Sequence, residues 1–168
     1  MAGLDPAIQS ICDASTEERQ MASPHYEFPP FLDGRVTKQK YSRWLAHKAA
    51  THVKRDRKRL PSTVVISDYK QKIHKAVCAS DGIDWYTGEN LEWEKIGTYN
   101  NEESKANRSH YKAGLALLPT VDHVLGENNG YDFVICGWRT NDAKNDLNLR
   151  EFLDVCRKVV ARHGSANL

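Results

Sequence analysis

Pro119-Thr-Val-Asp-His-Val124 and Trp138-Arg-Thr-Asn-Asp-Ala-Lys-Asn145 are the two stretches around which we interpret the chain. The first is predicted to be a strand that ends at Asp122 and His123, and in the second Asn141 stands at the opening of a helix. Carboxylate and amide oxygens are hard ligands that suit a divalent cation. A neutral imidazole is the usual general base for drawing a proton from water. A cation on one side of a phosphate and a base on the other would suit phosphodiester hydrolysis.

The composition predicts one soluble, globular protein. The chain has 168 residues, of which 40% are hydrophobic and 27% charged, enough for a domain with a real core. No apolar run approaches membrane-spanning length, and the N-terminus lacks the layout of a signal peptide, so no membrane partner is expected. The four cysteines form no CxxC pair, which argues against a disulfide scaffold and a cysteine zinc site and favours the cytoplasm. They are Cys12, Cys78, Cys136 and Cys156.

Positive charge is concentrated in one segment of an almost neutral chain. Between Arg35 and Arg59 stand ten lysines and arginines and one acid, Asp56, which gives +9 locally against a total of +2. Thr37 resembles an N-cap, and apolar residues recur at helical spacing, so a helix is predicted from there to about Arg59. A solvated helix face would explain the charge, and the lack of balancing acids makes binding to a nucleic acid backbone an equal alternative. The residues expected to contact DNA here are Lys40, Arg43, Lys54, Arg55, Arg57, Lys58 and Arg59.

The rest of the chain gives weaker signals. Residues 1–24 are polar and are expected to form a loosely tied arm. Asn148 and Glu151 make a capping box for a last helix, whose apolar side is expected to be buried: Leu149, Phe152, Leu153, Cys156, Val159 and Val160. The other predicted elements are a helix capped by Ser67 or Asp68 and stopped at Ser80-Asp-Gly82, a hairpin-like piece at 83–93, a surface loop at 98–108, a turn at 126–130 and a returning strand at 131–138.

The order of strand, Asp-His, turn, strand and helix with Asn resembles the ββα-metal fold of the HNH endonuclease family. The residues that carry the resemblance are Thr120-Val-Asp-His-Val124 and Phe133-Val-Ile-Cys-Gly-Trp-Arg-Thr-Asn-Asp-Ala-Lys144, preceded by the knuckle-like Tyr86-Thr-Gly-Glu-Asn-Leu91. It covers roughly residues 84–145. It implies an α+β protein with a nuclease core at 81–168, preceded by a basic, helical, DNA-contacting region at 25–80.

The resemblance also implies a role for each residue of the motif. His123 would be the general base, and Asp122 and Asn141 would hold one Mg²⁺ or Mn²⁺ ion. The family's middle Asn falls at or near Asp132, which could tie the two strands by accepting backbone hydrogen bonds; Asn128 or Asn129 is an alternative. Arg139 and Lys144 would contact phosphate. The implied activity is hydrolysis of DNA, expected to be double-stranded, to 5′-phosphate and 3′-hydroxyl ends.

The chain departs from the family in having no zinc knuckles. The four zinc-binding cysteines would fall near Asp84, Thr87, Gly137 and Thr140, so no structural zinc is expected. Aromatic packing would have to replace it, with Trp85, Tyr86, Trp93 and Trp138 as the candidates. Two other functions stay open: a nucleic-acid-binding module that has kept the fold without the activity, and an RNase. A homodimer would be needed if both strands of a duplex are cut.

Overall fold

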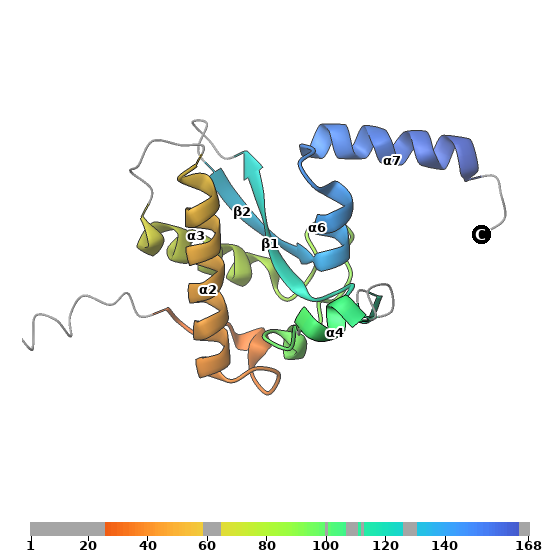
Figure 1. The fold of residues 1–168 in the computed structure, drawn as a ribbon. Helices are drawn as coiled ribbons and strands as arrows, with labels where there is room; N and C mark the ends of the chain where they lie inside the picture. Colours follow the sequence, from red (N-terminus) through yellow and green to blue (C-terminus); the bar gives the residue numbers. More distant parts are fainter. Residues whose placement is uncertain are drawn as a thin grey trace, which may run out of the picture.

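The computed structural model is a mixed α+β fold in which helices surround a small antiparallel sheet (Figure 1). The predicted α+β class is therefore confirmed. The structure describes residues 26–58, 65–99, 101–106, 111, 113–125 and 131–164, so the predicted arm at 1–24 and Arg59 lie outside the described residues. Among these residues no helix has the length and apolar character that crossing a membrane requires.

Two long helices make up the N-terminal half. α2 (Lys38–Asp56) begins as predicted, because the Thr37 side chain accepts a hydrogen bond from a first-turn amide at 3.2 Å. α3 (Ile66–Ser80) begins before the predicted caps, Ser67 and Asp68, and no side chain caps its first turn. The two helices pack on each other, and α3 also packs on strand β2. The packing of α3 thus links α2 to the sheet.

The chain between α3 and the sheet is built from turns and short helical pieces. Asp81 and Gly82 take positive φ values of 46° and 85°, which end α3 at the predicted stop. A bridge between Ile83 and Asn90 confirms the hairpin-like piece. The predicted loop at 98–108 instead contains a helix, whose acids in the first turn and lysine in the last suit the helix dipole. The short pieces are η1 (Pro30–Leu32), η2 (Trp93–Lys95) and α4 (Asn101–Ala106).

The sheet consists of two strands that lead directly into a helix. β1 (Pro119–Leu125) pairs antiparallel with β2 (Tyr131–Gly137), and His123 stands opposite Phe133. β1 matches the predicted strand, Pro119 to Val124, to within one residue, and it continues two residues beyond the Asp-His pair at which we expected it to end. α6 (Trp138–Lys144) follows β2 without an intervening residue. Asn141 therefore lies in the middle of α6 and not at its opening.

One hydrophobic core joins the helices to the sheet. Ile73 of α3 and Trp93 of the following segment are both fully buried in it. The Phe133 ring of β2 packs edge-on against Tyr69 of α3, with 5.1 Å between ring centroids. The predicted boundary near residue 80 therefore runs through a shared core, and the helical region positions the sheet.

A buried carboxylate fastens the β2–α6 junction to the turn that follows α3. Asp84 is 1% exposed, and its Oδ1 accepts hydrogen bonds from the amides of Tyr86 at 2.8 Å and Thr87 at 3.3 Å. Its Oδ2 accepts from the Gly137 amide at 2.7 Å and from the Thr140 hydroxyl at 2.8 Å. Asp84, Thr87, Gly137 and Thr140 are the four positions near which the resemblance puts zinc-binding cysteines. A hydrogen-bonded carboxylate links these positions in this chain.

The four aromatic residues predicted to pack in this region all make ring contacts: Trp85 with Tyr86, Trp93 with Trp44 and Phe31, and Trp138 with Tyr99. Trp93 is fully buried, but Trp85 is 51% exposed. Gly137 is needed at the junction because a Cβ atom there would lie 2.9 Å from the Ala116 carbonyl oxygen and 3.1 Å from Asp84 Oδ2. The close approach that glycine permits is what lets the Asp84 carboxylate reach the backbone of β2.

The last helix confirms its cap and contradicts its predicted burial. α7 (Leu149–His163) begins with the predicted capping box, in which Asn148 accepts from the Glu151 amide at 3.0 Å and Glu151 accepts from the Asn148 amide at 2.9 Å. None of its residues is buried, and Val160 is 66% exposed. Figure 1 shows the helix extending away from the body of the molecule. The described residues therefore leave its apolar stripe largely uncovered.

Candidate functional site

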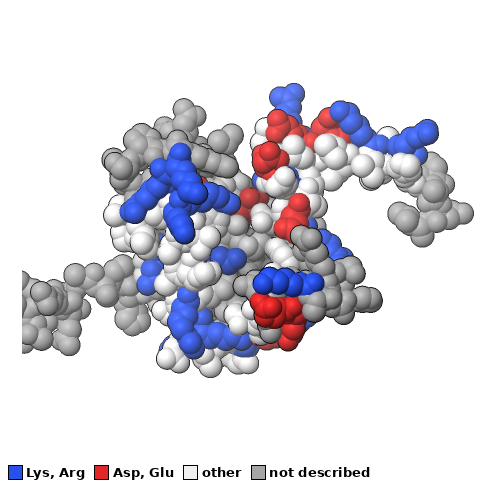
Figure 2. All heavy atoms as spheres, viewed as in Figure 1, with Lys and Arg blue, Asp and Glu red and all other residues white. Residues whose placement is uncertain are grey.

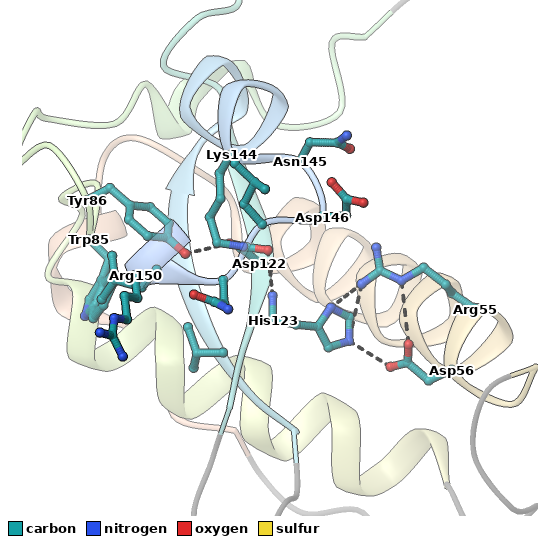
Figure 3. Close-up of a pocket in the computed structure, with 14 residues that line it drawn as sticks. Arg55, Asp56, Trp85, Tyr86, Asp122, His123, Lys144, Asn145, Asp146 and Arg150 are labelled. Atoms are coloured by element: carbon teal, nitrogen blue, oxygen red, sulfur yellow. Dashed lines mark hydrogen bonds and ion pairs between the residues drawn. The ribbon is translucent and has the colours of Figure 1, made fainter. Parts of the chain in front are cut away.

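A cavity of about 880 Å³ opens where the C-terminal end of α2, strand β1, the turn after Asp84 and residues 144–150 meet. Asp122 and His123, the pair singled out from the sequence, both line it. Figure 3 shows the Asp56 and Arg55 side chains of α2 reaching toward His123, and Lys144 reaching Asp122. The cavity thus brings together residues that lie far apart in the sequence, among them Asp56 and His123, 67 positions apart.

The Asp122 carboxylate is buried and has three close partners. Its Oδ2 accepts a hydrogen bond from the Tyr86 hydroxyl at 2.6 Å and pairs with Lys144 Nζ at 2.9 Å. Its Oδ1 accepts from the His123 amide at 2.8 Å. Burial and the hydrogen bond to Asp122 raise the pKa of Tyr86, so its phenol stays protonated and remains the donor. The carboxylate is therefore held in one orientation, with a buried ammonium balancing its charge.

The His123 imidazole lies between two residues of α2. Its Nε2 is 2.7 Å from Asp56 Oδ2, and the same oxygen accepts a hydrogen bond from the Tyr69 hydroxyl at 2.9 Å. On the Nδ1 side the ring is in close contact with Arg55 Nη2, which also lies 3.0 Å from His52 Nδ1. Asp56 is only 2% exposed, so the imidazole has a buried carboxylate on one side and a cation on the other.

The surroundings set the charges of these groups. Burial, together with the charge of Arg55, lowers the pKa of His123, and the hydrogen bond to Asp56 only partly offsets this. The imidazole is therefore neutral at physiological pH. Burial raises the pKa of Asp56, but hydrogen bonds from His123 and Tyr69 outweigh it, so the net shift is downward and the carboxyl is ionised. Burial lowers the pKa of His52 to about 3, which keeps this ring neutral as well.

Asp132 and Asn141, two predicted residues of the catalytic motif, lie outside the cavity lining. Asp132 is exposed, pairs with Lys72 at 3.5 Å and does not line the cavity, so the structure does not bring it to the site. Asn141, the predicted second metal ligand, is half-buried on α6 and is also outside the cavity lining. One turn further along, Asn145 does line the cavity.

The predicted DNA-contacting residues divide between the two ends of α2. Arg55 lines the cavity, and the exposed Lys54, Arg57 and Lys58 lie beside it in the chain. Figure 2 shows lysine and arginine side chains gathered over this end of the helix. Lys40 lies near the opposite end, where its ammonium donates to the Glu94 carbonyl at 2.9 Å. Arg43, in the same half of α2, is exposed. Arg139, on α6, is also exposed, and both residues lie outside the cavity lining.

Lys144 has a different environment from the one predicted. It is 5% exposed and lies in the last turn of α6, so its nearest anion is the Asp122 carboxylate and not a phosphate in solvent. A cation at the C-terminal end of a helix is favoured by the helix dipole. Lys144 therefore belongs to the wall of the cavity, where an anion that enters would find it beside Asp122.

Sequence reasoning missed Asp56 and Tyr86, which both contact the motif. A signal for Asp56 was present: it is the only acid in the basic segment, and it lies three and four residues after Val53 and His52 on the apolar side of α2. An acid on the buried side of a helix needs a partner. Tyr86 was predicted only as part of the knuckle-like stretch and as a packing aromatic, and nothing in the sequence marked it as a partner of Asp122.

The donor atoms at the cavity suit a hard cation in their chemistry. Asp122, Asn145 and Asp146 all line it, and oxygen ligands of this kind are those that Mg²⁺ and Mn²⁺ prefer. Among the described residues no group of three or more histidines, cysteines and acids could hold a metal ion. An ion at Asp122 would have to share the carboxylate with Lys144.

Comparison with known proteins adds no assignment to this site. No family model, no curated protein and no solved structure matches the chain.

Proposed function

We propose that the chain is a metal-dependent DNA endonuclease of the HNH, ββα-metal type, with His123 as its general base. The observation that carries the proposal is the cavity itself. A neutral imidazole lies there beside a buried carboxylate, and two cations, Arg55 and Lys144, border the same space. A base next to cations is the arrangement that hydrolysis of an anionic ester needs.

In the proposed reaction His123 draws a proton from water. The water oxygen forms a bond to phosphorus while Nδ1 accepts the proton. The bond from phosphorus to the 3′ oxygen breaks, and that oxygen takes a proton from solvent, which leaves 5′-phosphate and 3′-hydroxyl ends. Arg55 now covers the Nδ1 side, but a charged phosphate offers a guanidinium a stronger, bidentate partner than a neutral imidazole does. An entering phosphate would therefore draw Arg55 away from the base.

Asp122 would hold the divalent cation in this proposal. Asn141 remains the second ligand that the resemblance implies, and Asn145, which lines the cavity, is the rival that the geometry favours. A bound Mg²⁺ or Mn²⁺ ion would neutralise charge on the phosphate oxygens in the transition state. Lys144, beside the same carboxylate, would add to that positive field.

A pure binding module is the second candidate, and one observation favours it. The ion pair between Lys144 and Asp122 already neutralises the carboxylate that the metal would need. A module of this kind would bind nucleic acid through the basic end of α2 without metal and would never cut it. An RNase of the same design would share every residue of the proposed mechanism and differ only in substrate.

End-labelled single-stranded DNA, duplex DNA and RNA of matched sequence would separate these candidates. Each would be incubated with the protein in Mg²⁺, Mn²⁺ or EDTA, and the products analysed for a 5′-phosphate. The proposal expects metal-dependent cutting of DNA. Cutting of RNA alone would indicate the RNase. Retarded migration without cutting, in every metal, would indicate the binding module.

A further inference from the structure

We infer that Asp56 of α2 is a positioning residue that holds His123 in the tautomer with hydrogen on Nε2 and a lone pair on Nδ1. The catalytic consequence of this assignment rests on the proposed function, but the tautomer itself does not. The residue lies outside the ββα unit, on the helix whose basic residues we expect to contact DNA. The tautomer of the general base would thus be set by a residue outside the motif.

The first contact that supports this is the one at Nε2. Asp56 Oδ2 lies 2.7 Å away, and an ionised carboxylate can only accept a hydrogen bond. Nε2 must therefore carry the hydrogen. Because Asp56 is 2% exposed, no water can easily take over as partner, and the bond has a large influence on which nitrogen is protonated.

The second contact, at Nδ1, is independent and agrees with the first. The nearest group there is Arg55 Nη2, which lies closer to Nδ1 than to Nε2, at 3.3 Å from the latter. A guanidinium only donates hydrogen bonds, so the nitrogen that it meets must present a lone pair. A hydrogen on Nδ1 would set two donors against each other. Both sides of the ring therefore require the same tautomer.

Asp56 is itself held in place. The Tyr69 hydroxyl donates to the same Oδ2 at 2.9 Å, and Arg55 Nε lies 3.6 Å from Oδ1. Phe133 packs against both the Tyr69 ring and the His123 ring, with centroid distances of 5.1 and 5.0 Å. The two ends of the Asp56–His123 hydrogen bond are thus fixed to one core. An orienting carboxylate that could move would select no tautomer; this one is rigid.

Nitrogen NMR on protein with ¹⁵N-labelled histidine tests the assignment without a substrate. Long-range ¹H–¹⁵N spectra distinguish a ring nitrogen that bears hydrogen from one with a lone pair, and a His123→Gln variant identifies the signal among the seven histidines. The wild type is expected to show hydrogen on Nε2. Hydrogen on Nδ1 in the wild type would overturn the inference with no need for a further variant.

Asp56→Asn should then shift His123 toward a mixture of tautomers, because an amide can donate as well as accept. Tyr69→Phe is the matched comparison: it removes the other hydrogen bond to the same Asp56 oxygen but keeps the carboxylate and its contact with Arg55, so it should shift the His123 tautomer much less than Asp56→Asn does. Loss of stability in both variants with an unchanged tautomer in both would show a merely structural role, and would refute the inference.

Kinetics on a cleaved substrate give the second readout. Asp56→Asn should lower kcat by roughly 10²- to 10⁴-fold, the range that a general base contributes, with KM little changed. A wild type that cuts no nucleic acid but shows hydrogen on Nε2 would refute the proposed function and leave this inference standing. If the wild type cuts DNA and Asp56→Asn changes neither the His123 tautomer nor kcat, the proposed function stands and this inference is refuted.

Discussion

At the scale of single residues, the ion pair between Asp122 and Lys144 decides how the site treats a metal ion. Both side chains are nearly buried, and the ammonium lies 2.9 Å from the carboxylate oxygen. A divalent cation at Asp122 would have to compete with this ammonium or share the oxygen with it. The affinity of the site for metal is therefore set in part by Lys144.

Lys144→Met should therefore bind Mn²⁺ more tightly than the wild type, by roughly tenfold, which corresponds to about 1.4 kcal/mol. The variant should also be less stable, by about 3 kcal/mol, since it leaves a buried carboxylate unpaired. Isothermal titration with Mn²⁺ measures the affinity, and Asp122→Asn serves as the variant that should lose binding. Equal Mn²⁺ affinity in Lys144→Met and the wild type would show that Lys144 and metal do not compete.

The sequence allowed some of these residues to be predicted and not others, for a physical reason. Asp122 and His123 are adjacent in the chain, so their chemistry is visible in the sequence itself. The partner of His123 is 67 positions away, and only the packing of α2 on the sheet brings it close. Asn141 was predicted to be a metal ligand but lies outside the cavity lining, because spacing along a helix does not fix which side chains line a cavity.

At the scale of elements, the Asp84 carboxylate is the feature that holds α6 to the rest of the fold. It is buried and accepts four hydrogen bonds, two from the turn at Tyr86 and Thr87 and two from the β2–α6 junction. Because Asn141 and Lys144 lie on α6, this carboxylate also sets where they stand relative to Asp122.

Asp84→Ala should lower the free energy of unfolding by about 3 kcal/mol, because the substitution leaves several buried hydrogen-bond donors without an acceptor. Urea unfolding measures this. Asp154→Ala is the control, because Asp154 is exposed and its ion pair with Lys158 one turn away is worth less than about 1 kcal/mol. If Asp84→Ala cost no more than the control, the junction would owe its stability to packing.

Local signals predicted the starts of α2 and α7 but not that of α3, and tertiary context decided which faces are buried. The caps Thr37 and Asn148 act as predicted because a cap depends on neighbouring residues alone. The apolar stripe of α7 was predicted to be buried, but periodicity shows only that a helix has an apolar side, not what covers it. The homodimer that cutting of both strands of a duplex would need stays a prediction.

At the scale of the whole molecule, the basic end of α2 lies beside the cavity, and its other end lies about 27 Å away along the helix axis. A nucleic acid whose phosphate enters the cavity would run over Lys54 and Lys58, which are exposed and one turn apart. Lys40 and Arg43 lie toward the far end of the same helix. The structure therefore predicts a larger contribution to DNA binding from Lys54 and Lys58 than from Lys40 and Arg43, which the sequence did not distinguish.

Replacing Lys54 and Lys58 together by Ala should weaken DNA binding more than replacing Lys40 and Arg43, although both pairs remove the same charge. Each lost phosphate contact should also reduce the slope of log affinity against log salt by about 0.9. Fluorescence anisotropy with a labelled duplex at several salt concentrations measures both effects. Equal losses from the two pairs would mean that DNA contacts the whole length of α2.

The α+β class was predictable because the two strands and the following helix carry clear periodicity. That the region before residue 80 shares a core with the sheet was not predictable, because the contacts between α3 and β2 join positions far apart in the chain. Composition and charge pointed to a separate DNA-binding region, while the buried faces of α2 and α3, with Ile73 fully enclosed, make that region part of the same core as the site.

The most direct test of the central claim, that His123 is the base of a metal-dependent nuclease, is incubation of supercoiled plasmid with Mg²⁺, Mn²⁺ or EDTA. His123→Ala would be compared with His47→Ala, which removes an exposed histidine outside the cavity lining. We expect relaxed or linear plasmid with the wild type and His47→Ala in metal, none in EDTA, and at least about 10²-fold slower cutting by His123→Ala. Undiminished cutting by a folded His123→Ala variant, or no cutting by the wild type in either metal, would show that His123 is not the base of such a nuclease.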